Sequence, residues 1–354
     1  MAFRRPLVLS VIGARPEIIQ AAPVCAALRP VADEVLVHTG QHYDEAMSGA
    51  QILATRLPAP DHDLGVGSRP RDEQVDVGRR RLARLLRTVR PDAVVVRGDT
   101  NGTLSGTLAA VEAGVPLVHV EAGLRSYRDD MPEELNRVET DRRADLLLAP
   151  TRGAARNLEG EGVRGAVRVT GDPLCDILES WRARIAPETG EYVLATVHRN
   201  YNTDDPARLQ AVLDCLGRSP WPVVFPVHPR TRTCLASPEL RVPSNVRLVD
   251  PVPYTRMLAL ERGARVVATD SGGVQREAYL WGVPCVTLRE ETEWIDTVEA
   301  GWNTLVAADP DRFAEAVRRP APRERPPVFG DGHAAERIAA AVVGLVNDQH
   351  LEAA

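Results

Sequence analysis

Three acidic residues stand where apolar runs end and helix-like segments begin. Asp99 and Glu121 each follow a short apolar run, and Glu133 opens a helix-like segment. The carboxyl ends of parallel strands meet at one edge of a sheet, so we expect these carboxyl groups to share one face. Crowded carboxyl groups perturb one another's pKa values, which prepares acids and bases for proton transfer. Helix-dipole partners and metal ligands are the alternatives; the ordered ligand spacing of a metal site is missing, so we expect no metal.

A second group of residues suits an anionic ligand. His198-Arg199 and His228-Pro229-Arg230 each end an apolar run. Arginine offers a planar fork for phosphate, and histidine can supply a hydrogen bond or a proton. Either pair alone could be structural, but two such pairs at strand ends favour a binding site.

The segment 269–277, Thr-Asp-Ser-Gly-Gly-Val-Gln-Arg-Glu, passes from a strand through small residues into a helix. Ser271, Gly272 and Gly273 would let a diphosphate approach the backbone amides at the helix N-terminus, and Glu277 could accept hydrogen bonds from a ribose diol. A simple capped helix is the alternative. The turn Gly13-Ala14-Arg15-Pro16-Glu17 similarly offers Arg15 to a ligand, or leaves it solvated with Glu17 as a helix cap.

These residues need parallel sheets to position them, and the chain alternates apolar, strand-like runs with helix-like segments, which is typical of βαβ units. The first set of expected strands is 7–12, 35–39, 93–96, 117–120, 146–149 and 167–170. The second set is 192–197, 223–227, 246–249, 265–269 and 283–288. We therefore predict an α/β fold with two Rossmann-like domains, 1–172 and 173–330, and a C-terminal helix within 331–354 that packs on the first domain.

Length and composition agree with two soluble domains and exclude several functions. The 354 residues exceed what one core usually holds, and no apolar stretch reaches the ~20 residues of a membrane span. All 43 basic residues are arginine, which excludes a Schiff-base lysine for pyridoxal phosphate and a P-loop lysine; we expect no cofactor. A net charge of −6 and 4% aromatic residues make nucleic acid an unsuitable partner. Five widely spaced cysteines indicate a reducing cytoplasm.

Taken together, the motifs closely resemble those of the non-hydrolysing UDP-N-acetylglucosamine 2-epimerases over nearly the whole chain. The resemblance rests on 13–16, 39–44, 98–100, 119–126, 132–137, 198–199, 228–230, 270–275 and 290–294. It implies the glycosyltransferase-B architecture, in which two Rossmann-like domains face a cleft and a C-terminal helix crosses back to the first domain. It also implies a UDP-sugar substrate and, as is usual in the family, a homodimer.

The family's reaction removes the proton from carbon 2 of the sugar while UDP leaves carbon 1, and UDP then returns to the glycal. The resemblance implies that Asp99, Glu121 and Glu133 transfer the protons, without saying which of them is the base. It also implies that His198 and Arg15 stabilise the departing diphosphate. The substrate-binding residues that it implies are Arg15, Gln20, Arg199, Tyr201, His228, Arg230, Ser271, Gly272, Gly273, Glu277 and Arg289.

The chain departs from the family pattern at three positions. Gln20 stands where the family usually has lysine, Tyr201 where relatives often have glutamate, and Asp44 where some relatives have an allosteric-site glutamine. Because Gln20 and Tyr201 are neutral, we expect an altered sugar or a slower reaction, and Asp44 puts regulation by substrate in doubt. A glycosyltransferase of the same architecture, a hydrolysing epimerase and a homologue without catalysis remain alternatives, although the retained acidic trio argues against the last.

Overall fold

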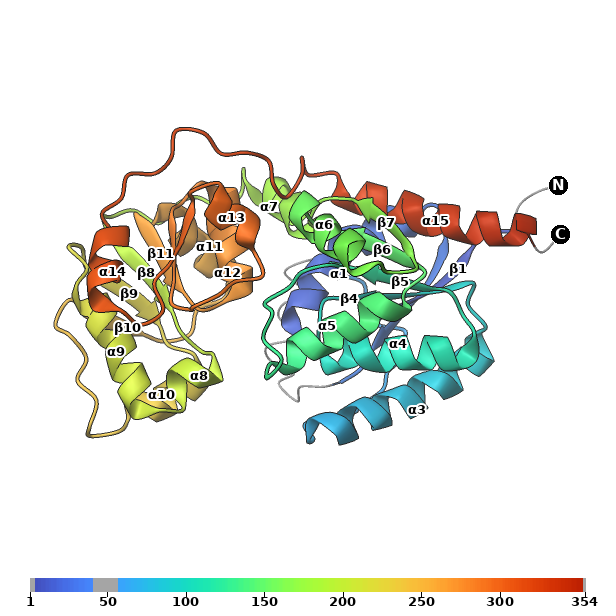
Figure 1. Cartoon of the computed structure of the whole chain (residues 1–354), viewed down its shortest axis with the longest axis horizontal. Helices are drawn as coiled ribbons and strands as arrows, with labels where there is room; N and C mark the ends of the chain where they lie inside the picture. Colours follow the sequence, from blue (N-terminus) through green and yellow to red (C-terminus); the bar gives the residue numbers. More distant parts are fainter. Residues whose placement is uncertain (1–3, 41–56, 353–354) are drawn as a thin grey trace. The chain divides into compact units, whose positions relative to one another are not determined.

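The computed structural model of the chain describes residues 4–40 and 57–352 and contains two parallel sheets (Figure 1). The chain divides into two compact units. The first comprises the residues up to Glu179 together with those from Pro327 on, and the second is Ser180–Pro326. In the described part of the chain, no helix combines the length and the apolar character that crossing a bilayer requires.

The sheet of the first unit has the order β3-β2-β1-β4-β5-β6-β7. Its strands are β1 (Leu7–Ile12), β2 (Asp33–His38), β3 (His62–Asp63), β4 (Ala93–Arg97), β5 (Leu117–Val120), β6 (Leu146–Ala149) and β7 (Ala166–Val169). All the predicted strands of this unit are present. The two-residue strand β3 was not predicted, because a His-Asp pair carries no apolar run.

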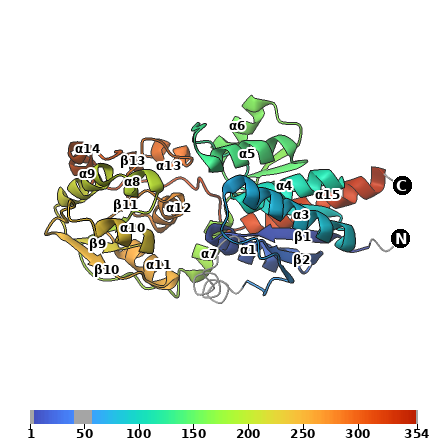
Figure 2. The same cartoon turned by 90° about the horizontal axis from the view of Figure 1, so that it is seen from below.

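Helices cover both faces of this sheet, as the near-continuous apolar strands require. They are α1 (Arg15–Leu28), α3 (Arg71–Val89), α4 (Asn101–Ala113), α5 (Pro132–Arg143), α6 (Arg152–Glu161) and α7 (Pro173–Trp181). On one face, Val95 of β4 packs with α1. On the other face, a Cβ at Gly106 of α4 would lie 2.7 Å from Val96, so α4 packs tightly on the sheet. Helices α3 and α4 lie side by side (Figure 1, Figure 2).

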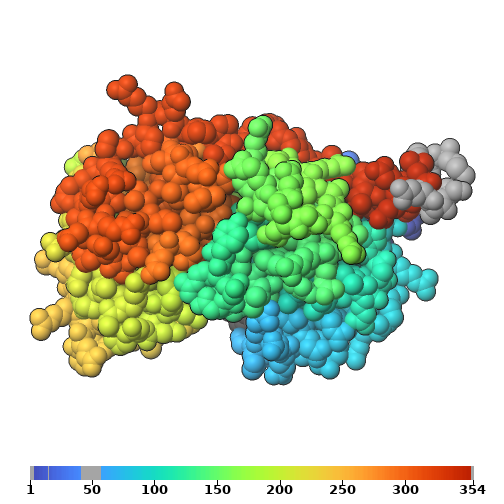
Figure 3. Space-filling model, in the orientation of Figure 1, coloured from blue at the N-terminus to red at the C-terminus, as the bar shows by residue number. Residues whose placement is uncertain are grey.

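The C-terminal helix α15 (Ala334–Glu352) packs on the first unit, as predicted. Ile338 and Val342 are fully buried in the same core cluster as Val24 and Leu28 of α1. The outer side of the helix is at the surface, where Figure 3 shows it in red. The apolar residues of α15 recur at helical spacing, and the stripe that they form packs into the core of the first unit.

The sheet of the second unit has the order β10-β9-β8-β11-β12-β13. Its strands are β8 (Val193–Thr196), β9 (Val223–Pro226), β10 (Val246–Val249), β11 (Val266–Thr269), β12 (Cys285–Thr287) and β13 (Asn303–Leu305). Its helices are α8 (Asn200–Thr203), α9 (Pro206–Gly217), α10 (Pro229–Leu235), α11 (Tyr254–Gly263), α12 (Gly272–Trp281), α13 (Ile295–Glu299) and α14 (Pro310–Ala316). The sequence predicted every strand except β13, whose three residues are too few to form a pattern.

The first unit continues past residue 172, the end of the predicted first domain, into α7. Asp176 of α7 accepts hydrogen bonds from the backbone amides of Ala334 (3.1 Å) and Ala335 (2.9 Å) at the start of α15. The backbone amide of Asp172 donates to the carbonyl oxygen of Phe329. These bonds tie most of α7 and the returning segment to the first unit.

Candidate active site

Both sheets have a topological switch point, where the order of the strands reverses: strands on one side of it run backward through the sequence, and strands on the other side run forward. In the first sheet it lies between β1 and β4, and in the second it lies between β8 and β11. Open parallel sheets bind ligands beyond the carboxyl ends of the strands at such points. Asp99 follows β4, His198 follows β8, and Ser271 follows β11, so the predicted residues occupy the expected edges.

Asp99 lies in the turn between β4 and α4 and is held by helix α5. Its carboxylate pairs with the guanidinium of Arg137, and its backbone carbonyl accepts a hydrogen bond from Asn136 at 2.9 Å. Gly98 adopts the left-handed conformation (φ +61°) that this turn requires. The Asp99 side chain keeps 26% of its surface exposed, so the carboxylate is fixed and still accessible.

Glu121 is buried and sits directly after β5 with a left-handed backbone (φ +70°). Such a conformation costs a non-glycine residue about 1–3 kcal/mol and is retained where the surroundings enforce it, commonly at functional sites. Its Oε1 lies 3.9 Å from the position that a Cβ on Gly98 would take. The structure therefore brings the Glu121 carboxyl group beside the turn that carries Asp99.

Gln20, on α1, is buried against Glu121, and its amide Nε2 donates to the Glu121 carboxylate. Its Oε1 is buried and has no hydrogen-bond partner among the described residues. The position at which the chain departs from the family pattern thus directly contacts one of the three predicted proton-handling groups.

Glu133 opens α5 and is half-buried, while its neighbour Glu134 is buried and has a different task. Glu134 accepts hydrogen bonds from the backbone amide and hydroxyl of Ser126, both at 2.9 Å, and pairs with Arg137 at 2.8 Å. Glu134 therefore holds the loop before α5, and Glu133 is the more accessible of the two carboxyl groups.

Glu17 is a structural residue. Its buried carboxylate accepts hydrogen bonds from the amides of Gly13 (2.5 Å) and Ala14 (2.9 Å) and from the hydroxyls of Thr100 (2.6 Å) and Thr103 (2.9 Å). Burial raises the pKa of the Glu17 carboxyl, and these hydrogen bonds oppose the shift. The side chain of Arg15 and the whole of residue Asp44 lie outside what the structure describes. Among the described residues, no three acidic, histidine or cysteine side chains form a group that could hold a metal ion.

In the second unit, Asp270 organises the turn after β8. It is fully buried and accepts hydrogen bonds from the backbone amides of His198 (3.1 Å) and Arg199 (2.9 Å) and from the side chain of Asn202 (3.1 Å). The Nδ1 of His198 lies 3.5 Å from its carboxylate, and the His198 side chain is 37% exposed. Asp270 thus holds His198 in place while part of the imidazole ring stays exposed to solvent.

His228 lies beside His198, with the two ring centroids 5.7 Å apart. Its Nδ1 accepts the backbone N–H of Arg230 at 3.3 Å, which orients the imidazole ring. Arg230 itself is exposed, and its guanidinium makes 2.7 Å contacts with both carboxylate oxygens of Asp204. The structure therefore brings the two histidines together and engages Arg230 in a surface ion pair.

The two glycines at the N-terminus of α12, Gly272 and Gly273, have different surroundings. Ser271 caps the helix. A Cβ on Gly272 would come within 2.9 Å of the indole nitrogen of Trp294, so this glycine is needed for packing. A Cβ on Gly273 would find its nearest heavy atom at 3.8 Å, so the space over Gly273 is open to a ligand.

Glu277 is buried, and its Oε1 accepts a 2.5 Å hydrogen bond from the hydroxyl of Tyr254. This bond fixes the carboxylate and leaves Oε2 as its second acceptor atom. No motif pointed to Tyr254, because this residue begins another helix, 23 positions earlier in the chain.

Tyr201, which is half-buried, lies near Arg289 in the second unit. Burial raises the pKa of the Tyr201 hydroxyl, and its Oη has no hydrogen-bond partner in the described part of the chain. Arg289 is fully buried and pairs with Glu293 and Glu291 at 3.0 Å each. The guanidinium of Arg289 is thus already neutralised by carboxylates.

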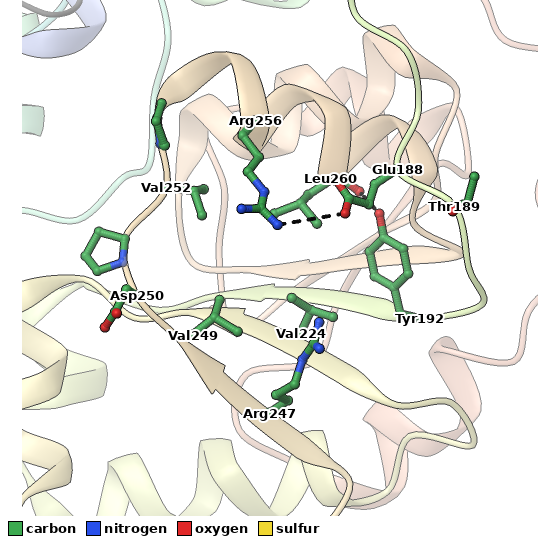
Figure 4. A pocket seen from close by; sticks show the side chains of 12 residues that line it. Glu188, Thr189, Tyr192, Val224, Arg247, Val249, Asp250, Val252, Arg256 and Leu260 are labelled. Atoms are coloured by element: carbon green, nitrogen blue, oxygen red, sulfur yellow. Dashed lines mark hydrogen bonds and ion pairs between the residues drawn. The ribbon is translucent and has the colours of Figure 1, made fainter.

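A cavity of about 410 Å³ in the second unit lies apart from these residues (Figure 4). Val224, Val249 and Leu260 form part of its lining, and Arg256 reaches across it to within 3.9 Å of Glu188. The residues lining it include none of the predicted substrate-binding residues.

Residues 26–343 match the family model described as UDP-N-acetylglucosamine 2-epimerase. The chain belongs to this epimerase family. It is an isomerase that acts on carbon 2 of a UDP-amino sugar.

Relatives of the epimerase span almost its entire length. A UDP-N-acetylglucosamine 2-epimerase homolog of Methanococcus maripaludis is 38% identical, covering 94% of the chain and 98% of the relative. A UDP-2,3-diacetamido-2,3-dideoxy-D-glucuronate 2-epimerase of Pseudomonas aeruginosa is 39% identical, with the same coverage.

A crystal structure of the Methanocaldococcus jannaschii UDP-GlcNAc 2-epimerase, in complex with UDP-GlcNAc and UDP, has the same fold. It superimposes with a TM-score of 0.85 at 33% identity and covers 96% of the chain and 99% of that structure. The predicted glycosyltransferase-B type of fold is confirmed.

Proposed function

We propose that this epimerase inverts carbon 2 of UDP-N-acetylglucosamine, or of a modified UDP-amino sugar, by eliminating and re-adding UDP without net hydrolysis. The observation that carries the proposal is the placement of two acidic residues at the carboxyl edge of the first sheet. Asp99 is fixed by Arg137, and Glu121 lies in a left-handed conformation beside Gly98, the residue before Asp99. Membership of the family supplies the reaction class.

In the proposed reaction a carboxylate removes the proton from carbon 2. The electron pair of the C–H bond becomes the second bond between carbons 1 and 2, and the bond from carbon 1 to the diphosphate oxygen breaks. UDP then adds back to carbon 1 while a proton is delivered to the opposite face of carbon 2. Asp99, Glu121 and Glu133 are the candidate acids and bases, since inversion needs a proton donor and a proton acceptor on opposite faces.

The nucleotide is proposed to bind at the switch point of the second sheet. The open space over Gly273 and the amides at the start of α12 suit a diphosphate, and His198 and His228 offer neighbouring donors. Arg15 and Arg199 would add positive charge as UDP departs. The fixed carboxylate of Glu277 suits the ribose diol.

Gln20 and Tyr201 support a choice of sugar that differs from that of relatives with charged residues there. Gln20 contacts Glu121. Because the family usually has lysine at this position, the neutral amide of Gln20 removes a positive charge beside a proposed acid or base. The relatives at 38% and 39% identity carry different substrate names, so we propose UDP-N-acetylglucosamine and UDP-2,3-diacetamido-2,3-dideoxy-D-glucuronate as the two candidates.

Incubation with each candidate in heavy water, followed by NMR, tests the proposal. A carbon 2 epimer that carries deuterium, with no net release of UDP, is the expected result. Free sugar and UDP would instead indicate a hydrolysing epimerase. If neither sugar gains deuterium at carbon 2, the proposed reaction is wrong for both.

We further propose a homodimer that works in the cytoplasm. The family resemblance supports the homodimer, and the five free cysteines, four of them buried, are those of a protein that needs no disulfide. Light scattering on the purified protein would test the oligomeric state.

A further inference from the structure

His119, on β5, is a fully buried histidine whose two ring nitrogens both contact oxygen atoms. Nε2 lies 2.8 Å from the backbone carbonyl of Gly98, and Nδ1 lies 2.6 Å from Oδ1 of Asp141. A carbonyl oxygen can only accept a hydrogen bond, so Nε2 must carry a hydrogen. The state of the ring is then decided by Asp141.

Asp141, on α5, is also fully buried and is surrounded by donors. Its Oδ2 accepts hydrogen bonds from the backbone amide of Gly123 at 3.1 Å and from Nη1 of Arg125 at 2.7 Å. Burial raises the pKa of the Asp141 carboxyl, but His119 and Arg125 outweigh burial, and the net pKa is lowered. A backbone amide and a guanidinium can only donate, so the Asp141 carboxyl accepts from both as an anion, and Nδ1 of His119 must carry a hydrogen as well.

The three residues His119, Asp141 and Arg125, here called the His119 cluster, join the chain segments that carry the predicted acids and bases. The Gly98 carbonyl immediately precedes Asp99, and the Gly123 amide lies two residues after Glu121. Asp141 lies about two turns along α5 from Glu133. Each segment thus has a hydrogen bond to the same buried cluster.

We propose that His119 is a positioning residue, a buried imidazolium that holds the Gly98–Asp99 turn, the Glu121–Gly123 turn and helix α5 in one arrangement for proton transfer at carbon 2. This inference rests on the proposed function of Asp99, Glu121 and Glu133. Its physical reason is that Glu121 is a non-glycine residue in the left-handed conformation, which persists only under restraint.

Arg125 connects the His119 cluster to helix α6 and contributes to its charge balance. Its guanidinium pairs with both carboxylate oxygens of Glu161 on α6, at 2.7 and 2.8 Å, and donates to the carbonyl of Leu124 at 2.7 Å. Two cations, His119 and Arg125, therefore face two carboxylates, Asp141 and Glu161. A buried network of this kind is stable only when every member is satisfied, so loss of one member should loosen the turns.

The test compares His119→Gln with Val118→Ala. Glutamine is neutral and carries both donor hydrogens on one nitrogen, so it cannot reproduce the two opposed donors of the imidazolium. Val118 is a fully buried neighbour on β5 outside the cluster. A misplacement of about 1 Å can cost on the order of 100-fold in rate, so we expect kcat of His119→Gln to fall about 10- to 100-fold. KM for the UDP-sugar and Kd for UDP should stay within about 3-fold, because the proposed nucleotide site lies in the second unit.

Equal loss of kcat in His119→Gln and Val118→Ala at matched melting temperatures would overturn the proposal, because general destabilisation would then explain both. Proton NMR of ¹⁵N-histidine-labelled wild-type protein gives a readout that needs neither a variant nor activity. Two slowly exchanging ring protons on His119 are expected, and a single ring proton would contradict the imidazolium. If the wild type epimerises neither candidate sugar, the proposed function fails, while the NMR result still decides the state of His119.

Discussion

Gly273→Ala separates ligand binding from folding at the start of α12. The added methyl group would meet no heavy atom closer than 3.8 Å, so the fold can accept it. Alanine is favoured over glycine inside helices by about 0.5–1 kcal/mol, so the melting temperature should be unchanged or higher. The methyl group would, however, occupy the space proposed for the diphosphate.

The expected loss of affinity follows from the hydrogen bonds at risk. Each bond from a backbone amide to a charged oxygen contributes about 1.5–3 kcal/mol, and losing one would weaken UDP binding roughly 10- to 150-fold. Isothermal titration calorimetry with UDP measures Kd, and differential scanning fluorimetry measures the melting temperature. Weaker binding together with unchanged or greater stability is the predicted combination.

Gly272→Ala is the matched control. Its methyl group would come within 2.9 Å of the Trp294 indole nitrogen, and such overpacking costs about 1–3 kcal/mol of stability. This variant should therefore lose stability, whereas Gly273→Ala should not. Wild-type affinity for UDP in Gly273→Ala would refute the placement of the diphosphate on this helix.

Three further predictions concern single residues. Asp270→Asn should weaken UDP binding and lower the melting temperature, since it removes the buried negative charge and replaces one of the two acceptor oxygens with a donor NH2 group beside His198, Arg199 and Asn202. Calorimetry and fluorimetry showing no change would contradict this. Gln20→Lys should alter kcat or the preference between the two candidate sugars, and steady-state kinetics unchanged for both would remove Gln20 from specificity. Because the pKa of Asp141 is lowered in the folded protein, its carboxylate stabilises the fold above pH 3.8, the usual pKa of this group, and the stabilisation is lost as pH falls through the folded-state pKa. In urea unfolding, Asp141→Asn should therefore lose less stability below pH 3.8 than the wild type.

The sequence was sufficient to predict the strand ends and the turn 269–273, because both depend on local pattern. In this chain, the apolar runs that lead to Gly-Asp or Ser-Gly-Gly are strands, and a helix follows each of these turns. Strand β13 (Asn303–Leu305) lacks such a run and forms because β12 is there to pair with it. Its formation is decided by tertiary contacts.

The groups that hold the site were not predictable in the same way. His119 and Asp141 are 22 residues apart, and only the packing of α5 against the sheet brings them together. Asp270 was recognised as part of a motif, yet its role depends on the amides of a turn about 70 residues earlier in the chain. The role of Glu134 likewise depends on the loop at Ser126 and on Arg137, so neighbouring glutamates in the sequence have different tasks.

The central claim is that the carboxyl groups of the first unit move the carbon 2 proton. The most direct measurement is deuterium uptake at carbon 2 of the accepted UDP-sugar, compared between wild type and the combined variant Asp99→Asn, Glu121→Gln, Glu133→Gln. The prediction is that the variant loses uptake while it remains folded and binds UDP with wild-type affinity, since the proposed nucleotide site is in the second unit. Uptake that continues at the wild-type rate without these three carboxylates would contradict the claim.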